Sequence, residues 1–196
     1  MSAKHEITRA DILPLDDYLK SRADRRAKAT SIKRDRRVEV GPSATFYFEN
    51  YETMWHQIHE MLAIEKGGEA QIDDELAAYN PLVPKGRELV ATLMFEIDDP
   101  DRRDALLRRL GGIEHRITLS FDGETVAAVP EGDVERTDAS GKASSVHFLH
   151  FPFTPAQIEK FRRAGTRATL GFDHDAYGHT AAIPEAVRAA LAADFD

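Results

Sequence analysis

The spacing of Glu52, His56 and His59 is the first feature of this sequence that could support chemistry. Residues three and four positions apart lie on the same side of an α-helix, so this carboxylate and the two imidazoles could converge on one cation. Such a ligand set suits iron, zinc or manganese. The alternative is a solvated helix face, on which Glu52 and His56 form only a weak pair.

A second polar segment follows a predicted strand near the C-terminus, and it reads His174-Asp175-Ala176-Tyr177-Gly178-His179. Loops at strand ends commonly carry functional groups. His174, Asp175 and His179 are possible metal ligands and acid–base groups, whereas an exposed turn is the alternative interpretation. The sequence therefore allows a divalent metal as cofactor without identifying one.

The familiar catalytic motifs are missing from the sequence. It has no Gly-rich dinucleotide motif, no P-loop, no Gly-x-Ser-x-Gly and no His-Glu-x-x-His. It also has no cysteine, which excludes disulfides, cysteine-bound metals and a thiol nucleophile. The sequence does not identify catalytic residues, and whether the chain is an enzyme stays open.

The elements that must position these residues indicate an α+β fold. Apolar stripes at helical spacing predict helices at 7–19, 50–66, 70–79 and 184–195. Asn50 is suited to cap the second of these helices, and Gly67-Gly68 to end it. We expect residues 1–196 to form a single domain with four parts. These parts are an N-terminal helix, basic arm and strands (1–49), a helical pair (50–80), a duplicated core (88–173) and a C-terminal helix (183–195).

The predicted core contains two stretches with the same order of signals. Each has a strand, a helix that begins at a proline (Pro100 or Pro155), an Arg-Arg pair and a strand that ends in Thr-Leu-x-Phe-Asp. These features predict a duplicated strand–helix–strand unit, in a mixed and mostly antiparallel sheet that is ferredoxin-like in part. Asp122-Gly123 predicts a hairpin turn after the first unit.

The charge of the chain is unevenly distributed. Residues 20–37 hold nine Lys and Arg residues against Asp24 and Asp35, whereas the whole chain carries a net charge of −8. This basic arm fits a segment that binds a partner or a phosphate, or a solvated helix paired with the acidic body. The overall acidity and the lack of aromatic residues in the arm argue against nucleic acid.

The sequence contains no signal-peptide core and no apolar run long enough to span a bilayer, which argues against a membrane. The absence of cysteine suits a reducing compartment, so we expect a cytoplasmic protein.

Several short motifs resemble those of an uncharacterised bacterial group, domain-of-unknown-function family 3501, over nearly the whole chain. The motifs are Ile7-Thr8-Arg9-Ala10-Asp11-Ile12-Leu13, Lys33-Arg34-Asp35-Arg36-Arg37-Val38 with Gly41-Pro42, Phe48-Glu49-Asn50, Glu52-Thr53-Met54, Gln57-Ile58, Glu60-Met61-Leu62, Glu75-Leu76 with Tyr79-Asn80, and His174 with Tyr177. Genes of this group often lie beside rubrerythrin-like and iron–sulfur oxidoreductase-like genes, so the resemblance implies a redox or oxidative-stress setting.

The same motifs imply a set of ligand-binding residues: Glu49, Asn50, Glu52, Gln57, Glu60, Tyr79, His174 and Tyr177. Three hypotheses remain open. The first is a non-catalytic accessory protein that binds a protein partner of a redox system through the basic arm or the 50–66 helix. The second is a small-ligand-binding protein, and the third is a metal-dependent protein or enzyme. The sequence leaves the oligomeric state open.

Overall fold

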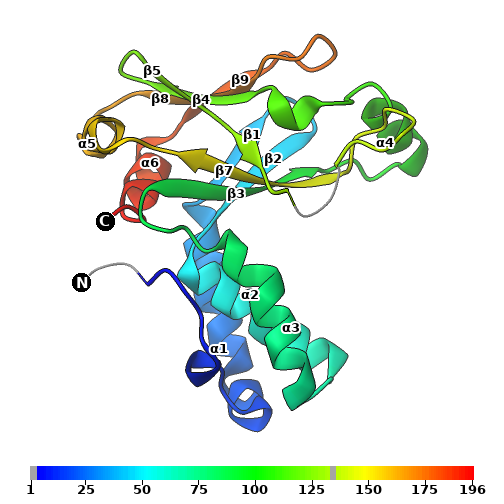
Figure 1. Ribbon diagram of the computed structural model, residues 1–196, viewed down its shortest axis with the longest axis vertical. Helices are drawn as coiled ribbons and strands as arrows, with labels where there is room; N and C mark the ends of the chain where they lie inside the picture. The colour runs from blue at the N-terminus through cyan, green and yellow to red at the C-terminus, as the bar shows by residue number, and fades with distance from the viewer. Residues whose placement is uncertain (1–3, 133–135) are drawn as a thin grey trace.

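The strands of the protein form two antiparallel sheets. The structure is a computed structural model that describes residues 4–132 and 136–196. Within these residues, one sheet has the strand order β1-β2-β3-β7-β6 and the other has the order β5-β4-β8-β9 (Figure 1). The strands are β1 (Arg37–Val40), β2 (Ala44–Glu49), β3 (Glu88–Phe95), β4 (Ile117–Phe121), β5 (Glu124–Ala127), β6 (Val129–Pro130), β7 (Val146–Pro152), β8 (Ala168–Phe172) and β9 (Thr180–Ile183).

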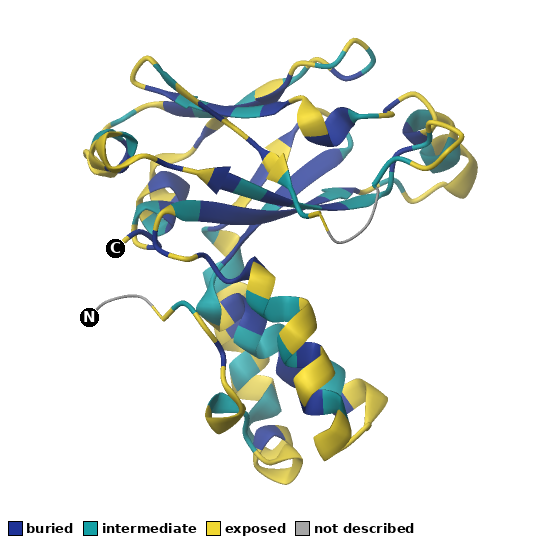
Figure 2. Ribbon diagram, in the orientation of Figure 1, coloured by how far each residue is buried: buried dark blue, intermediate teal, exposed yellow. Residues whose placement is uncertain are grey.

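The main hydrophobic core lies between the two sheets (Figure 2). Side chains alternate between the two faces of a strand, so Phe46 and Phe48 of β2 and Leu89 and Leu93 of β3 all point inward. Each of these four residues is at most 1% exposed. The ring of Phe46 lies 5.4 Å from that of Phe172 on the opposite sheet. Burying each such side chain contributes about 2 kcal/mol, which makes this layer the main source of stability.

The two predicted strand–helix–strand units have the same arrangement. The first comprises β3, α4 (Pro100–Leu107) and β4, and the second comprises β7, α5 (Pro155–Arg162) and β8. β3 pairs with β7, and β4 pairs with β8. The caps also agree, because Asp99 and Thr154 each accept a hydrogen bond from a backbone N–H of the helix that follows. The α+β class is confirmed, whereas an origin by duplication stays a prediction.

The expectation of a single sheet is wrong. Each unit places its first strand in the five-stranded sheet and its second strand in the four-stranded sheet. The apolar pattern of a segment predicts a strand but does not say which other strands it pairs with, so the sequence could not separate one sheet from two facing sheets. The hairpin turn is confirmed, since Asp122 and Gly123 have φ values of +45° and +74° and connect β4 to β5.

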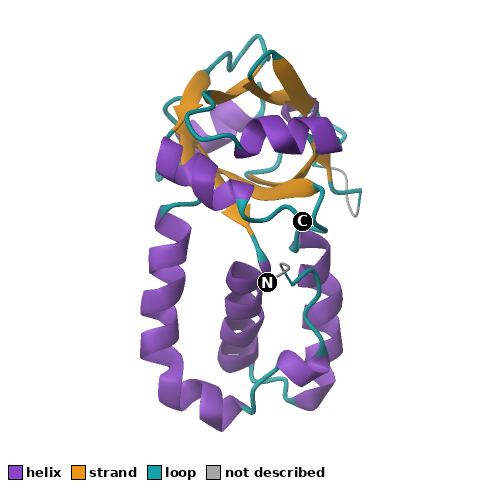
Figure 3. Cartoon of the chain, turned by 90° about the vertical axis from the view of Figure 1, so that its left-hand side faces the viewer, coloured by secondary structure: helices purple, strands orange, loops and turns teal. Residues whose placement is uncertain are grey.

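Three helices form a layer below the five-stranded sheet (Figures 1 and 3). They are α1 (Leu15–Arg34), α2 (Tyr51–Glu65) and α3 (Glu69–Tyr79). Met54 and Ile58 of α2 form a second apolar cluster with Val90, which lies on the outer face of β3. α2 therefore fixes the helical layer to the sheet. None of the helices in the described part of the chain has the length and apolar character needed to cross a bilayer.

The predicted helix at 7–19 is wrong in its bounds. A short 3-10 turn, η1 (Arg9–Asp11), precedes Pro14, and α1 then continues without interruption to Arg34. Proline is tolerated at the start of a helix, and alanine, arginine and lysine are strong helix formers, so α1 includes most of the basic arm. The arm is therefore mostly helical, and β1 is the element that follows α1. The C-terminal helix α6 (Glu185–Ala192) is shorter than predicted, and β9 was not predicted.

The remaining short turns are η2 (Asn80–Leu82), which follows α3, and η3 (Ile113–His115), which precedes β4.

The hairpin between β1 and β2 provides a test of the fold. Gly41 has φ +69°, and a Cβ there would lie 2.7 Å from the His179 ring and 2.8 Å from the Tyr177 hydroxyl. Gly123 has a similar φ of +74°, but a Cβ there would meet nothing within 4 Å. We expect Gly123→Ala to cost about 1 kcal/mol of unfolding free energy from backbone strain alone. Gly41→Ala should cost about 1–3 kcal/mol more because of the clash, and equal losses in urea unfolding would contradict this packing.

Candidate functional site

The start of α2 is held by side chains that the sequence marked as ligand-binding. Asn50 accepts a hydrogen bond from the Thr53 N–H at 3.0 Å, so it is the predicted helix cap. Glu49 is 5% exposed. Its two carboxylate oxygens accept hydrogen bonds from the hydroxyls of Thr53 at 2.6 Å and Thr92 at 2.9 Å. In this structure Glu49 therefore connects α2 to β3, and Asn50 begins the helix.

Glu60, in the middle of α2, holds α1 in place. The guanidinium of Arg22 donates to both carboxylate oxygens of Glu60 at 2.9 Å, and the Tyr18 hydroxyl donates to one of them at 2.7 Å. The hydrogen bonds from Arg22 lower the pKa of Glu60 to about 2. His56 lies 3.3 Å from the same Tyr18 hydroxyl, and burial lowers its pKa.

His59 fixes the N-terminal strap, which we define as residues 4–14, against α2. Its Nδ1–H donates to the Trp55 carbonyl at 2.7 Å, and its Nε2 accepts a hydrogen bond from the Leu13 N–H at 3.0 Å. Burial lowers the pKa of His59, which agrees with a neutral ring in these two contacts. The indole of Trp55 stacks on the His59 ring at 3.8 Å and donates to the Asp11 carbonyl at 2.8 Å.

The predicted metal site on α2 is not assembled. Both ring nitrogens of His59 are already occupied, and Glu52 forms an exposed ion pair with Lys28 at 2.9 Å. His56 faces Tyr18 instead. Helical spacing places these side chains on adjacent parts of the surface, but each one contacts a different neighbour, and only the tertiary structure determines those neighbours.

The predicted C-terminal site is also not assembled as a metal centre. Tyr177 is 3% exposed, and its hydroxyl donates to the Val40 carbonyl and accepts from the Ser43 N–H, both at 2.9 Å. His179 packs on the Tyr177 ring at 4.6 Å. His174 lies instead beside Gly111, near the exposed Asp175, in a separate groove. Among the described residues, no three His, Cys, Asp or Glu side chains could hold one metal ion.

Gln57 and Tyr79 connect α2 to α3. Burial raises the pKa of Tyr79, and the nearby Gln57 side chain opposes this shift. Gln71 of α3 donates to Glu75 at 2.8 Å and to Glu65 at 2.7 Å, so the acidic residues near this contact are also partnered. The contacts that hold the three helices together therefore involve four of the eight residues in the predicted ligand set: Glu52, Gln57, Glu60 and Tyr79.

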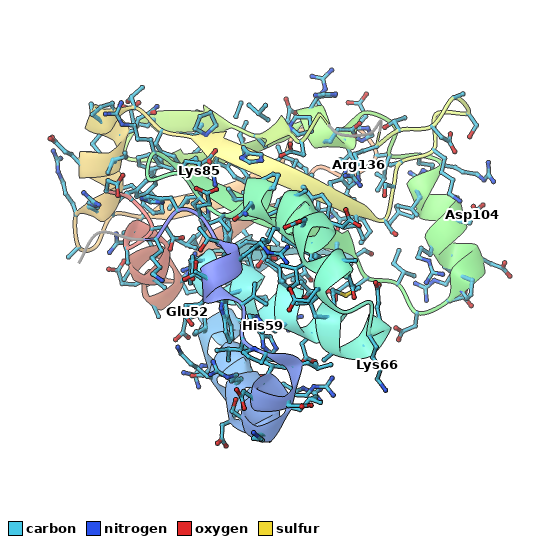
Figure 4. All side chains as sticks on the ribbon, turned by 60° about the horizontal axis from the view of Figure 1, so that its bottom comes forward. Glu52, His59, Lys66, Lys85, Asp104 and Arg136 are labelled. Carbon is cyan, nitrogen blue, oxygen red and sulfur yellow. The ribbon has the colours of Figure 1, made fainter. Side chains whose placement is uncertain are left out.

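A cavity of about 310 Å³ lies between the strap and the three helices, toward the end of the layer that is remote from the sheets. His59 and Tyr18 contribute to its wall, and Figure 4 shows His59 midway along α2 between Glu52 and Lys66. Most of the other lining residues are apolar, including Leu13, Leu15, Leu62 and Ile72. Since the polar groups of His59 and Tyr18 already have partners, the cavity favours an apolar occupant.

Exposed apolar side chains occur at the same end of the layer. α1 and α2 run antiparallel, because Lys28 pairs with Glu52 and Arg22 pairs with Glu60. This register brings the start of α1 to the end of α2, and it places three large apolar residues there: Leu15 is 37% exposed, Leu19 is 45% exposed and Ile64 is 63% exposed. We call these three residues the apolar end.

The sequence reasoning missed this surface. Leu15 and Leu19 have the helical spacing that usually indicates a core-facing stripe, and Ile64 belongs to the apolar helix α2. Their exposure follows from the length of the helical layer, whose free end lies away from the sheets (Figure 1). The sequence feature that could have indicated this surface is the pair of leucines, Leu15 and Leu19, in an otherwise strongly charged helix.

The structure defines an α+β protein in which a three-helix layer, with an apolar cavity at its free end, is attached to the outside of two facing antiparallel sheets. The chain belongs to the family described as protein of unknown function DUF3501, whose model matches residues 6–195. A crystal structure at 1.90 Å of a novel protein of unknown function from Burkholderia pseudomallei K96243 is similar to it. The two share 42% sequence identity with a TM-score of 0.89, over 97% of this chain and 99% of that chain. No curated protein matches the sequence.

The contact between Arg22 and Glu60 predicts a pH dependence of stability. The folded-state pKa of Glu60 is about 2 against an ordinary value of 4.5. The pair therefore stabilises the fold fully above pH 4.5, and this contribution is lost as the pH falls through 2. We expect Glu60→Gln to lower the unfolding free energy by about 1–3 kcal/mol at pH 7, and this deficit should shrink toward pH 2.

Urea unfolding at a series of pH values measures this deficit. Glu52→Gln is the matched control on the same helix, because the Glu52 side chain is 47% exposed in its pair with Lys28. It should change stability by no more than about 0.5 kcal/mol. A Glu60→Gln deficit that stays constant between pH 7 and pH 2 would contradict the assignment.

Proposed function

We propose that this protein is a non-catalytic binding protein, and that its binding surface is the apolar end of the helical layer. The observation that carries the proposal is the position of the exposed apolar residues. Of the four large apolar side chains that are exposed in the described residues, Leu15, Leu19 and Ile64 are at this end and only Val129 is elsewhere. Exposed apolar surface beside a cavity is typical of interaction sites.

A protein partner fits this surface better than a free small molecule. The cavity of about 310 Å³ is at the lower limit of ordinary small-molecule sites, but it can take one large apolar side chain. An anchor of that kind, surrounded by Leu15, Leu19 and Ile64, would reproduce the centre of a protein interface. The family resemblance leads us to propose that the partner belongs to a redox or oxidative-stress system.

A small apolar ligand that fills the same cavity is the second candidate. Trp55 is the only tryptophan of the chain, and its ring stacks on His59 in the cavity wall at 3.8 Å. The fluorescence emission of Trp55 should therefore change when a molecule fills the cavity beside His59. A saturable change in emission with a purified apolar compound, in the absence of any protein, would favour this candidate over a protein partner.

The proposal predicts that Leu19→Glu abolishes partner binding and leaves the fold intact. A photo-crosslinking amino acid at position 19 should capture a discrete partner in the cells that produce this protein. Binding of the purified partner should then weaken at least about tenfold in Leu19→Glu, because a charge would enter the buried centre of the interface. The unfolding free energy should change by no more than about 0.5 kcal/mol, since Leu19 is 45% exposed.

Val129→Glu is the matched control, because Val129 is 51% exposed on β6, away from the helical layer. This variant should bind the partner as the wild type does. The complex should also persist at high salt, because the contact is apolar. The proposal fails if position 19 gives no discrete adduct, or if Val129→Glu and Leu19→Glu weaken binding equally.

A further inference from the structure

A cationic groove lies at the opposite end of α1 from the apolar end. It has a volume of about 600 Å³ and is bordered by the last turns of α1, by β1 and β2, and by the β9 region. Three cations line it, Lys33, Arg34 and Arg37, whereas Glu39 is its only acidic lining residue. The groove is not used by the binding surface proposed above.

Internal ion pairs explain why positive charge remains at this end of α1. Three of the five cations at positions 20–28 form ion pairs within the protein. Lys20 pairs with Asp17 at 2.8 Å, Arg22 with Glu60 at 2.9 Å, and Lys28 with Glu52 at 2.9 Å. Arg36 is buried and pairs with Asp194. Arg25 donates instead to the Ser21 hydroxyl and lies over the Trp55 ring. Unlike Arg36, none of the three cations of the groove has a buried ion-pair partner within residues 4–132 and 136–196.

The cations of the groove have weak partners or none. Arg34 lies 3.4 Å from the adjacent Asp35, and its side chain is 75% exposed. Arg37 pairs with Glu39 at 2.7 Å, and both side chains are about half exposed or more. Lys33 forms no ion pair with any residue that the structure describes. Exposed pairs of this kind contribute only about 0–1 kcal/mol, so neither pair prevents its guanidinium group from contacting a ligand.

The floor of the groove holds Arg37 in position. Its guanidinium lies 5.7 Å above the centre of the Tyr47 ring, and Pro184 supplies apolar surface to the groove. Tyr47 is fixed in turn, because its hydroxyl donates to Glu96 at 2.9 Å. A cation over an aromatic ring, together with the two other cations that line the same groove, is suited to an anion that carries several charges.

We propose that this groove binds a small molecule that carries two or more phosphate groups. A guanidinium donates two parallel hydrogen bonds to a phosphate, and lysine adds a point charge. The volume of about 600 Å³ lies within the range of small-molecule sites. The lining has an excess of positive charge, and its one carboxylate is already paired with Arg37.

Titration calorimetry with tripolyphosphate at low ionic strength tests the proposal. We expect saturable binding of one molecule per chain. The double variant Lys33→Ala, Arg37→Ala should weaken binding at least about tenfold, because it removes two charge-assisted contacts. Lys20→Ala is the matched control, because it removes a lysine of the same helix outside the groove, and it should bind as the wild type does. Urea unfolding of each variant establishes that it is folded.

Three outcomes would overturn the proposal. The first is heat that does not saturate, which indicates general ionic attraction. The second is an equal loss of affinity in Lys20→Ala and in the double variant. The third is tighter binding of a hexaglutamate peptide than of tripolyphosphate, which would assign the groove to an acidic protein segment. None of these outcomes affects the apolar end, which is tested by Leu19→Glu.

Discussion

The buried guanidinium of Arg36 is the constraint on which the arrangement of the molecule depends. Arg36 is 4% exposed and lies at the junction of the helical layer, the five-stranded sheet and the C-terminal helix. It donates to the carbonyls of Phe48, Glu49 and Ala190, and to the carboxylate of Asp194. A buried charge is stable only when its donors are satisfied, so these four partners must be in place together. One side chain thereby fixes the end of β2 against the C-terminal helix.

The helical layer depends in turn on α2. Glu49 connects the start of this helix to Thr92 of β3, and Glu60 holds α1 through Arg22. His59 holds the strap, and Gln57 contacts Tyr79 of α3. Residues that resemble a ligand set in the sequence are therefore the contacts that assemble four segments around one helix. The surfaces that remain available for binding lie at the two ends of α1.

Much of the local structure could be predicted from the sequence because its signals are short-range. The cap at Asn50, the turn at Asp122-Gly123 and the proline starts of α4 and α5 each depend on residues within about four positions. The sites could not be predicted in the same way. The nitrogens of His59 are occupied by backbone groups of Trp55 and Leu13, and the second of these is distant in the sequence. Spacing along one helix contains no information about such a partner.

The sequence by itself determined the α+β class, the hairpin turn at Asp122-Gly123 and the concentration of positive charge in residues 20–37. The tertiary structure alone decided that the strands divide into two sheets, that Arg22 and Lys28 are neutralised, and that Leu19 remains exposed. The physical reason is the range of the interactions. Hydrogen-bonded turns and alternation act between near neighbours, whereas ion pairing and burial depend on residues that only the folded chain brings together.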